Sequence, residues 1–520
     1  MTTAPPAEDE VLLTSEETQL LSREATTTIR DDACDDPRAR FKWRVLVGAF
    51  AVLFLIELAY GISAPAWNAL LEKGLCTETY PEIAGFLSAG DENPHCKDRA
   101  VQGKLAMYRG WAYTLGCLPT LLLALPYGSL SDRWGRKPIA MLSISGITLG
   151  MVWYEVVFYF PLPMWTFTLS FVFNLIGGGS AVGMSMIYTM LADVLDVEEM
   201  TPVLFRFHSV FLVAELVANP LGGFLVGKDP WLALIVGNVF MILVMMGSVL
   251  IFPETLAVRL WRDKRSGKVP SPQLTPLDGG DGEQLKKSSM QAALGDARAQ
   301  LMDVWEFVIG NRRLVVLMLP LIFVTLGKYI QEMLLQYATK RFGWSWSKAS
   351  YFLTIKSASF IVMLTLILPA FSSFCLGTLG MSPLSKDMWL SRWSAVVLVL
   401  ADLAIAFSSS PALFGAGLVL LSGGSGLVPL LRSLLNAQVE PHHVGMLNTL
   451  LGFLDTLGVT IGAPIFSQSL RKGIELGGPW VGLPFLAGAV ISCFAAGILW
   501  LYRIPPQVEG SVPRLFERIT

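Results

Sequence analysis

The sequence predicts an all-α integral membrane protein with twelve transmembrane helices, and three observations carry this prediction. Only 15% of the 520 residues are charged and 53% are hydrophobic, whereas a soluble domain carries about 25% charged residues. The charges gather in short islands between apolar stretches of roughly 18 residues or more, which is enough to span a bilayer. The short alternating strands of a membrane barrel are absent. Backbone amides in lipid must be satisfied within their own segment, so the stretches should be helices.

The apolar stretches divide six and six around a polar island. We expect spans at 44–66, 105–127, 139–159, 165–190, 204–227, 231–252, 314–338, 350–374, 393–409, 411–434, 444–469 and 479–502. This gives a first six-helix bundle at 42–255, a cytoplasmic linker at 256–313 and a second bundle at 314–503. Tails cover 1–41 and 504–520; the first is polar, acidic and expected to be disordered. Residues 301–314 should form a short interfacial helix.

The distribution of Lys and Arg predicts the orientation. They gather before the first span, in the turn after the second and in the central linker, and such residues favour the cytoplasmic side. Both termini are therefore expected in the cytoplasm. We further expect a monomer embedded in a lipid bilayer, and the plasma membrane rather than a vacuolar or other internal membrane. The net charge of -2 says nothing about a nucleic-acid partner. Such a partner would need a basic face, and the lack of one argues against it.

Cysteine, histidine and glycine patterns bear on cofactors. Cys76 and Cys96 share the first external loop, where they could form a disulfide or remain separate thiols. The other four cysteines and the four histidines lack metal-ligand spacing. GGGS at 177–180 lacks the Lys of a phosphate-binding loop and lies inside an apolar span. We therefore expect no metal, no cofactor and no enzymatic activity.

A charged knot, GSLSDRWGRKP at 128–138, lies in the turn between the second and third spans. Gly128 and Gly135 allow close helix packing and a sharp turn. Asp132 can face the positive N-terminal end of a helix, and Arg136 can pair with Asp193 in the next cytoplasmic turn. We interpret the knot as a latch whose charge pairs hold the cytoplasmic side shut; the alternative is a signal for topology alone. Its residues are Gly128, Asp132, Arg133, Gly135, Arg136, Lys137 and Asp193.

The knot resembles the signature of the major facilitator superfamily, Gly-x-Leu-Ala-Asp-Arg-x-Gly-Arg-Lys, with Ser131 in place of Ala. The resemblance implies two pseudo-symmetric six-helix bundles and alternating access, and it places the eleventh helix, starting near Val444, beside Asp132. LLQYATKRFGWSWSKASYFL is similar to fungal members. ELVANPLGGF resembles an element of proton-driven exporters, with Asn219 in place of Gly. Asn174 stands where a fourth-span motif of the family has Arg. The loop at 377–392 keeps little of a second knot.

Ionisable groups at membrane depth are costly, so they are candidate functional residues. In the family fold, helices 1, 4, 7 and 10 line the cavity, and the substrate or proton site is expected to include Glu57, Asn174, Lys328, Glu332, Glu215 and Asp455. Two alternatives remain open: Lys328 and Glu332, four residues apart, could form an intrahelical ion pair, and Glu57 could pair with Lys328 or Lys356. Asp402 is expected to be structural. Arg109, Glu155, Lys356 and Arg432 are placed near span ends, where they can reach the interface.

The resulting hypothesis is alternating-access transport of a small organic molecule, by proton-coupled export of a metabolite or toxic compound. Glu57 or Glu332 would take up the proton and release a basic partner. A proton-coupled importer of a nutrient such as a sugar, vitamin or organic acid is the alternative within the same fold, and a receptor that binds without transport is the second.

Overall fold

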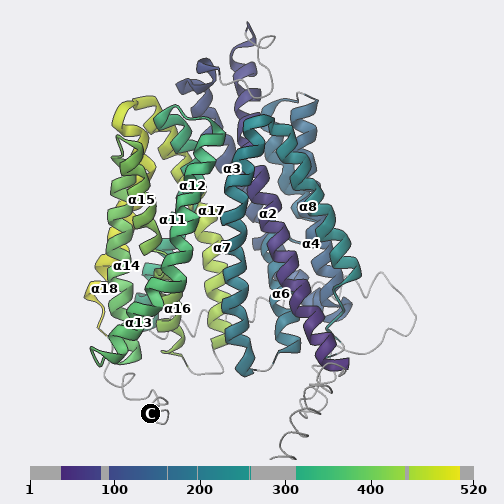
Figure 1. Cartoon of the computed structure of the whole chain (residues 1–520), viewed down its shortest axis with the longest axis vertical. Helices are drawn as coiled ribbons and strands as arrows, with labels where there is room; N and C mark the ends of the chain where they lie inside the picture. Colours follow the sequence, from purple (N-terminus) through teal and green to yellow (C-terminus); the bar gives the residue numbers. More distant parts are fainter. Residues whose placement is uncertain are drawn as a thin grey trace, which may run out of the picture.

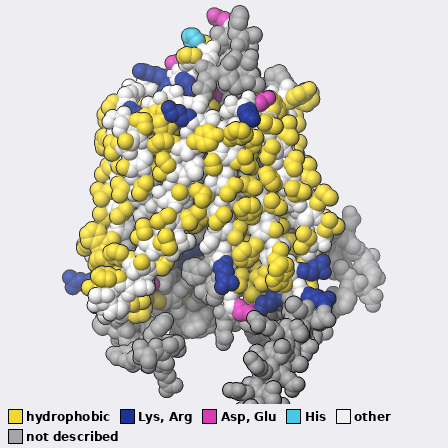
Figure 2. Space-filling model, in the orientation of Figure 1, with side chains coloured by type: hydrophobic (Ala, Val, Ile, Leu, Met, Phe, Trp, Pro, Cys, Tyr) yellow, Lys and Arg dark blue, Asp and Glu magenta, His cyan; other side chains and the backbone are white. Residues whose placement is uncertain are grey.

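The computed structural model describes residues 37–82, 93–160, 162–195, 197–256, 258, 312–439 and 444–503. In this part of the chain, twelve helical stretches are long and apolar enough to span a bilayer, so the predicted fold class is confirmed. They form one bundle, and the start of the first helix and the end of the last lie at the same end of it (Figure 1). We call this the terminal end and the opposite one the far end. On the face in Figure 2, hydrophobic side chains cover the middle, and Lys and Arg lie toward the two ends.

The first half of the bundle contains six spans. They are α2 (Pro37–Thr79), α3 (Arg99–Trp134), α4 (Arg136–Tyr159), a fourth span made of η3 (Met164–Ser170), α5 (Phe171–Asn174) and α6 (Gly179–Val194), then α7 (Val197–Lys228) and α8 (Pro230–Leu250). A short 3-10 helix, η2 (Pro94–Lys97), precedes α3.

The second half repeats the plan. Its spans are α11 (Arg312–Phe342), α12 (Trp346–Val362) continued by η4 (Met363–Ile367) and α13 (Leu368–Gly377), α14 (Pro383–Ala406), α15 (Pro411–Gly423) with α16 (Leu427–Asn436), α17 (Val444–Leu476), and η5 (Gly478–Gly482) with α18 (Leu483–Leu501). The expected tails, most of the linker and the interfacial helix expected at 301–314 lie almost entirely outside the described residues.

Several helices are longer than the apolar stretches that predicted them. The first runs over Pro37–Thr79 rather than 44–66, because apolar composition marks only the part that lipid surrounds, whereas the hydrogen-bonded backbone continues beyond it. Helix starts follow local signals. Asp229, Ser382 and Ser410 each cap a helix whose first residue is proline, the residue that a first turn accepts because it needs no amide donor there.

The two halves meet through two equivalent pairs of helices. The second span, α3, packs along the eleventh, α17, and the fifth, α7, packs along the eighth, α12. Exchanging the halves turns one pair into the other, which is the relation that a pseudo-two-fold axis requires. Within the halves, α2 packs on α7 and α8, and α14 packs on α18.

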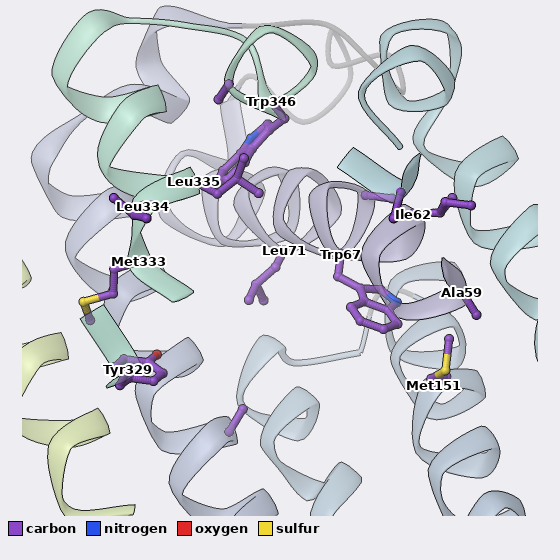
Figure 3. Packing of buried hydrophobic residues seen from close by; sticks show 14 of the residues in the cluster. Ala59, Ile62, Trp67, Leu71, Met151, Tyr329, Met333, Leu334, Leu335 and Trp346 are labelled. Carbon is purple, nitrogen blue, oxygen red and sulfur yellow. The ribbon is translucent and has the colours of Figure 1, made fainter. Parts of the chain in front are cut away.

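The hydrophobic cores of the halves are joined at one end of the bundle only. One cluster of buried residues crosses from α2 to α11 and α12 at the far end, and Figure 3 shows Trp67 and Leu71 in the same cluster as Met333 and Trp346. Toward the terminal end, the second half has a cluster of its own, whereas in the first half the shared cluster continues to Val45 and Phe252, beside a small cluster around Ile139. The halves are therefore fused at the far end and separate toward the terminal end.

The fourth span is interrupted, whereas its sequence predicted one helix over 165–190 with local kinks. Gly177, Gly178 and Gly179 all have positive φ, and they separate α5 from α6. The backbone groups freed by the break bond to side chains of neighbouring helices. Thr120 donates to the Gly178 carbonyl at 2.9 Å and Ser143 to the Gly179 carbonyl at 2.7 Å. Such internal satisfaction is what allows irregular backbone at membrane depth.

Candidate functional site

Three glutamates from both halves face the middle of the bundle. Glu57 of α2 lies within electrostatic range of Glu215 of α7 and Glu332 of α11. Glu57 is half-buried and the Glu332 side chain is exposed. In the described part of the chain, neither carboxylate has a salt-bridge partner. The middle of the bundle therefore holds acidic groups whose charge no neighbouring cation neutralises.

Aromatic side chains surround these carboxylates. Tyr60, one turn after Glu57 on α2, is 48% exposed, yet it lies within electrostatic range of Glu332, Arg109 and Tyr154, which belong to three other helices. A side chain that is open to solvent while four helices surround it must face an internal cleft rather than lipid. Tyr113 and Tyr329 meet edge to face across the two halves with ring centroids 5.0 Å apart.

Lys328 and Asp455, two of the expected site residues, form an ion pair. The Lys328 Nζ lies 2.6 Å from Asp455 Oδ2, so the pair joins α11 to α17 within the second half. The alternative in which Lys328 pairs with Glu332 on its own helix is wrong for this structure, because the ammonium points to the neighbouring helix. As a result, the Glu332 carboxylate has no salt-bridge partner among the described residues.

A second ion pair connects the halves. Lys356 Nζ of α12 lies 2.8 Å from Glu215 Oε1 of α7. Next to it, Asn219 of α7 donates to Ser357 of α12 at 2.9 Å. The alternative in which Glu57 pairs with Lys328 or Lys356 is therefore wrong, since both ammonium groups bind other carboxylates.

Two basic residues belong to the site although sequence reasoning placed them near span ends. Lys356 lies in the third turn of α12, because that helix begins at Trp346 rather than at residue 350. Arg109 Nη2 of α3 donates to the Glu332 carbonyl at 2.7 Å, and its Nη1 donates to Gln336 at 3.3 Å. To predict how deep these two residues lie in the membrane, one needs the residue at which each helix starts, which a signal such as the Ser345 cap before α12 gives and the apolar stretches do not.

Asn174 lies apart from the three glutamates in the contacts that the structure shows. It ends α5 at the break of the fourth span, beside Gly116 of α3 and Gly179. Any role of Asn174 in the site would therefore come from its position at the break of the fourth span, and not from contact with the three glutamates.

The charged knot forms a buried network at the terminal end of the first half. The Arg136 side chain is fully buried, although that of its partner Asp132 is 55% exposed. Arg136 Nη2 lies 2.7 Å from Asp132 Oδ1, and its Nε lies 3.2 Å from Asp193 Oδ2. Thr255 donates to the same Asp193 oxygen at 2.8 Å. Two carboxylates, one of them fixed by the Thr255 hydroxyl, thus hold one guanidinium where α3, α4 and α6 meet.

Glu254 belongs to this network and was not among the expected site residues. Its carboxylate accepts the backbone amides of Arg136 and Lys137 at 3.0 and 3.1 Å, so it caps the N-terminus of α4. Gly135 has φ +107°, and a Cβ there would lie 2.3 Å from Glu254 Oε2. The PET sequence at 253–255 was the available signal, because its acid follows the last helix of the half.

Other residues of the knot differ in their contacts. A Cβ at Gly128 would meet nothing within 4 Å, so the expectation that Gly128 permits close packing is wrong: its side of α3 faces open space. Lys137 Nζ donates to the Val249 carbonyl at 2.8 Å, and Arg133 is exposed. The eleventh helix, which the resemblance placed beside Asp132, starts at Val444 as expected; the residues just before it lie outside the described part of the chain.

The second half contains a reduced counterpart of the knot. Asp387, in the first turns of α14, accepts a hydrogen bond from Ser433 of α16 at 2.7 Å. This pair occupies the place that Arg136 and Asp193 occupy between the third and fourth spans. A hydroxyl stands where the first half has the Asp193 carboxylate, and the cation beside Asp387 is the adjacent Lys386, whose Nζ lies 3.0 Å from Asp387 Oδ1.

At the far end, Glu72 of α2 is a buried hub that connects the halves. It accepts hydrogen bonds from Lys97, from Gln102 and, in the second half, from Trp346. Lys97 also lies over the Trp346 ring, 4.9 Å from its centroid. These four side chains, which we call the far-end cluster, hold α2, α3 and α12 together.

The loop beside the far-end cluster is fixed by a disulfide and a hydrogen bond. Cys76 at the end of α2 is bonded to Cys96 of η2. Tyr80 donates to Asp98 at 2.8 Å, and this bond lowers the pKa of the Asp98 carboxyl and raises the pKa of the Tyr80 hydroxyl. The disulfide and the Tyr80–Asp98 hydrogen bond, on either side of Lys97 in the sequence, therefore hold Lys97 next to Glu72.

Comparisons with known proteins agree with this architecture. The family model described as Major Facilitator Superfamily matches residues 108–384. An efflux pump of Aspergillus flavus, ustT, is 29% identical over 88% of this chain and 87% of its own length. The MFS efflux pump atnC of Emericella nidulans is 27% identical over 85% and 84%. The crystal structure of a D-xylose-proton symporter matches with a TM-score of 0.59 at 12% identity, covering 89% of this chain and 99% of that one.

Proposed function

Because the chain belongs to the major facilitator superfamily, whose members are transporters rather than enzymes, we propose that it exports a small organic molecule in exchange for protons. The observation that carries this proposal is the pair of carboxylates, Glu57 and Glu332, which have no salt-bridge partner among the described residues and lie between two halves whose cores join at the far end only. Export is the direction favoured by the relatives, two of which are named efflux pumps.

The structure has the features of one state of an alternating-access cycle. The hydrogen bonds that cross between the halves include those of Trp346 with Glu72, Ser347 with Gly223 and Asn219 with Ser357, from the far end down to the middle. The cores are separate toward the terminal end. The positive residues favour the cytoplasmic side for the terminal end. In a monomer of the plasma membrane with this orientation, this is the state that receives substrate from the cell. Rocking of the halves would then open the far end.

The environment of Glu57 and Glu332 supports the proposed proton coupling. An ionised carboxylate inside a membrane protein is costly unless it is paired. A proton can neutralise it where no lysine or arginine does so. Uptake of a proton at the open far end and its release to the cytoplasm would change the charge that the two halves share, and so bias which end is open.

The charged knot would secure the other state. Asp132 is the exposed member of the buried Arg136 network, and it faces the side on which the terminal end must close. We propose that closure brings the start of α17 against it, so that the knot acts as a latch. The importer and receptor alternatives are separated from export by the experiments below.

The test of function is accumulation of a broad compound panel, measured by mass spectrometry in yeast that lacks its major exporters. Cells producing the wild type should accumulate less of one or more compounds, and a protonophore should abolish the difference. Higher accumulation would establish import instead, and saturable binding without any flux would establish a receptor.

The carboxylates give the first mutational prediction. Glu57→Gln and Glu332→Gln each keep the shape of the side chain but remove its titration, so we expect at least one of them to lose proton-driven efflux. The readout is the dependence of efflux on an imposed pH gradient in proteoliposomes. Asp402→Asn is the matched control, because Asp402 is buried between α14 and α18 and contacts Ser492 rather than the cleft. Full coupling in both glutamate variants would refute the assignment.

A further inference from the structure

Glu332 lies inside a partial ring of tyrosines. Its carboxylate is within electrostatic range of Tyr60 of α2, Tyr113 of α3 and Tyr329 of α11. Tyr60 continues into an aromatic wall, since its ring lies 5.1 Å from that of Trp67, which in turn lies 5.4 Å from that of Tyr154. The open carboxylate therefore lies near tyrosine side chains that both halves of the protein supply.

The charges around this ring leave it negative. Lys328 and Lys356 are each paired with a carboxylate. Arg109 is the remaining nearby cation, and it directs its donors to the Glu332 carbonyl and to Gln336 rather than to the Glu332 carboxylate. Two unpaired glutamates, Glu57 and Glu332, thus stand against one arginine. An anionic substrate would face two like charges there, whereas a cation would be attracted.

We propose that the cleft around Glu332 selects organic cations that carry aromatic rings, an inference that rests on the proposed transport function and names its substrate class. A positive group near the carboxylate gains a charge partner and lies over tyrosine faces, and a cation over an aromatic face is stabilised further when water is excluded. The substrate's rings pack against the exposed Tyr60 ring, which the buried Trp67 supports from behind. Because one carboxylate holds either a proton or the cation, binding one releases the other, which is the stoichiometric basis of exchange.

Tetraphenylphosphonium and tetraphenylborate provide a matched pair of probes with the same shape and opposite charge. Binding of each tritiated probe to the purified full chain is measured by scintillation proximity in separate samples, because the two ions precipitate one another when mixed. We expect saturable binding of tetraphenylphosphonium with an affinity at least tenfold higher than that of tetraphenylborate. Equal affinities for the two probes, or no saturable binding of tetraphenylphosphonium, would overturn the inference.

Variants assign the binding to this cleft. Glu332→Gln should weaken the affinity at least tenfold, and Tyr60→Leu should weaken it severalfold, whereas Tyr60→Phe keeps the ring and should retain it. Asp402→Asn should bind as the wild type does, and each variant is first shown to elute as a single species on size exclusion. Wild-type affinity in Glu332→Gln would show that the carboxylate does not recognise the cation.

The two proposals fail separately. Binding of the phosphonium that requires Glu332, without any flux driven by a pH gradient, would refute proton-coupled export and leave the substrate class intact. Proton-driven flux of neutral or anionic compounds, without phosphonium binding, would refute the substrate class and leave proton-coupled export intact.

Discussion

At the scale of single residues, the two carboxylates of the charged knot differ in exposure, so we expect one to stabilise the fold and the other to act in the conformational change. Asp193 is buried with Arg136, whereas the Asp132 side chain is half-exposed. Removing one partner of a buried ion pair costs about 3–5 kcal/mol, but an exposed pair is worth about 0–1 kcal/mol. We therefore expect Asp193→Asn to lower the thermal unfolding temperature strongly. Asp132→Asn should leave it nearly unchanged and slow transport. Similar unfolding temperatures with normal transport in both variants would reduce the knot to a topology signal.

The sequence could identify the acidic residues of the site but not their partners. Glu57, Glu332, Lys328 and Asp455 were predictable because charge in an apolar stretch is conspicuous. Which lysine binds which acid depends on helix rotation and neighbour, and these are set by packing between spans far apart in the chain. Lys328 accordingly joins Asp455, 127 positions away, rather than Glu332 on its own helix.

At the scale of elements, the broken fourth span shows what hydropathy does not detect. The run at 165–190 is apolar throughout, so its composition predicts a span, and only the three consecutive glycines indicate the break. The distorted tenth span has a similar glycine-rich stretch, GGSG at 423–426 between α15 and α16. The fourth and tenth spans are equivalent in the two halves, so the irregularity is shared by both repeats.

Glycine substitutions test the break. At Gly177, φ is +83° and a Cβ would lie 2.2 Å from the Ser143 backbone nitrogen, so Gly177→Ala should reduce the yield of folded protein severely. Gly128→Ala is the matched control in α3: nothing lies within 4 Å of its Cβ, and alanine in a helix is favoured over glycine by about 1 kcal/mol. The measurement is thermal unfolding of both purified variants. A stable Gly177→Ala would show that the backbone there can relax.

At the scale of the whole molecule, the number of spans and their division into halves followed from the sequence, whereas the state of the cycle did not. The state depends on a small difference between two packings of the same helices, and no local pattern records it. The far-end cluster around Glu72 should favour this state, because its hydrogen bond to Trp346 joins α2 of the first half to α12 of the second at the far end.

Weakening the far-end cluster should therefore shift the population toward the other state. In Glu72→Gln the side chain keeps its size, but its bonds to Lys97 and Trp346 lose the carboxylate charge, which strengthens such bonds about twofold. Spin labels at Lys104 and Lys472, which are exposed on α3 and α17 near the far end, should move apart in this variant. Labels at Leu125 and Phe453, toward the terminal end of the same helices, should approach each other. Distances are measured by double electron–electron resonance after replacing the cysteines outside the disulfide. Opposite changes at the two ends would establish rocking of the halves, while unchanged distances at both would show that other contacts hold the far end shut.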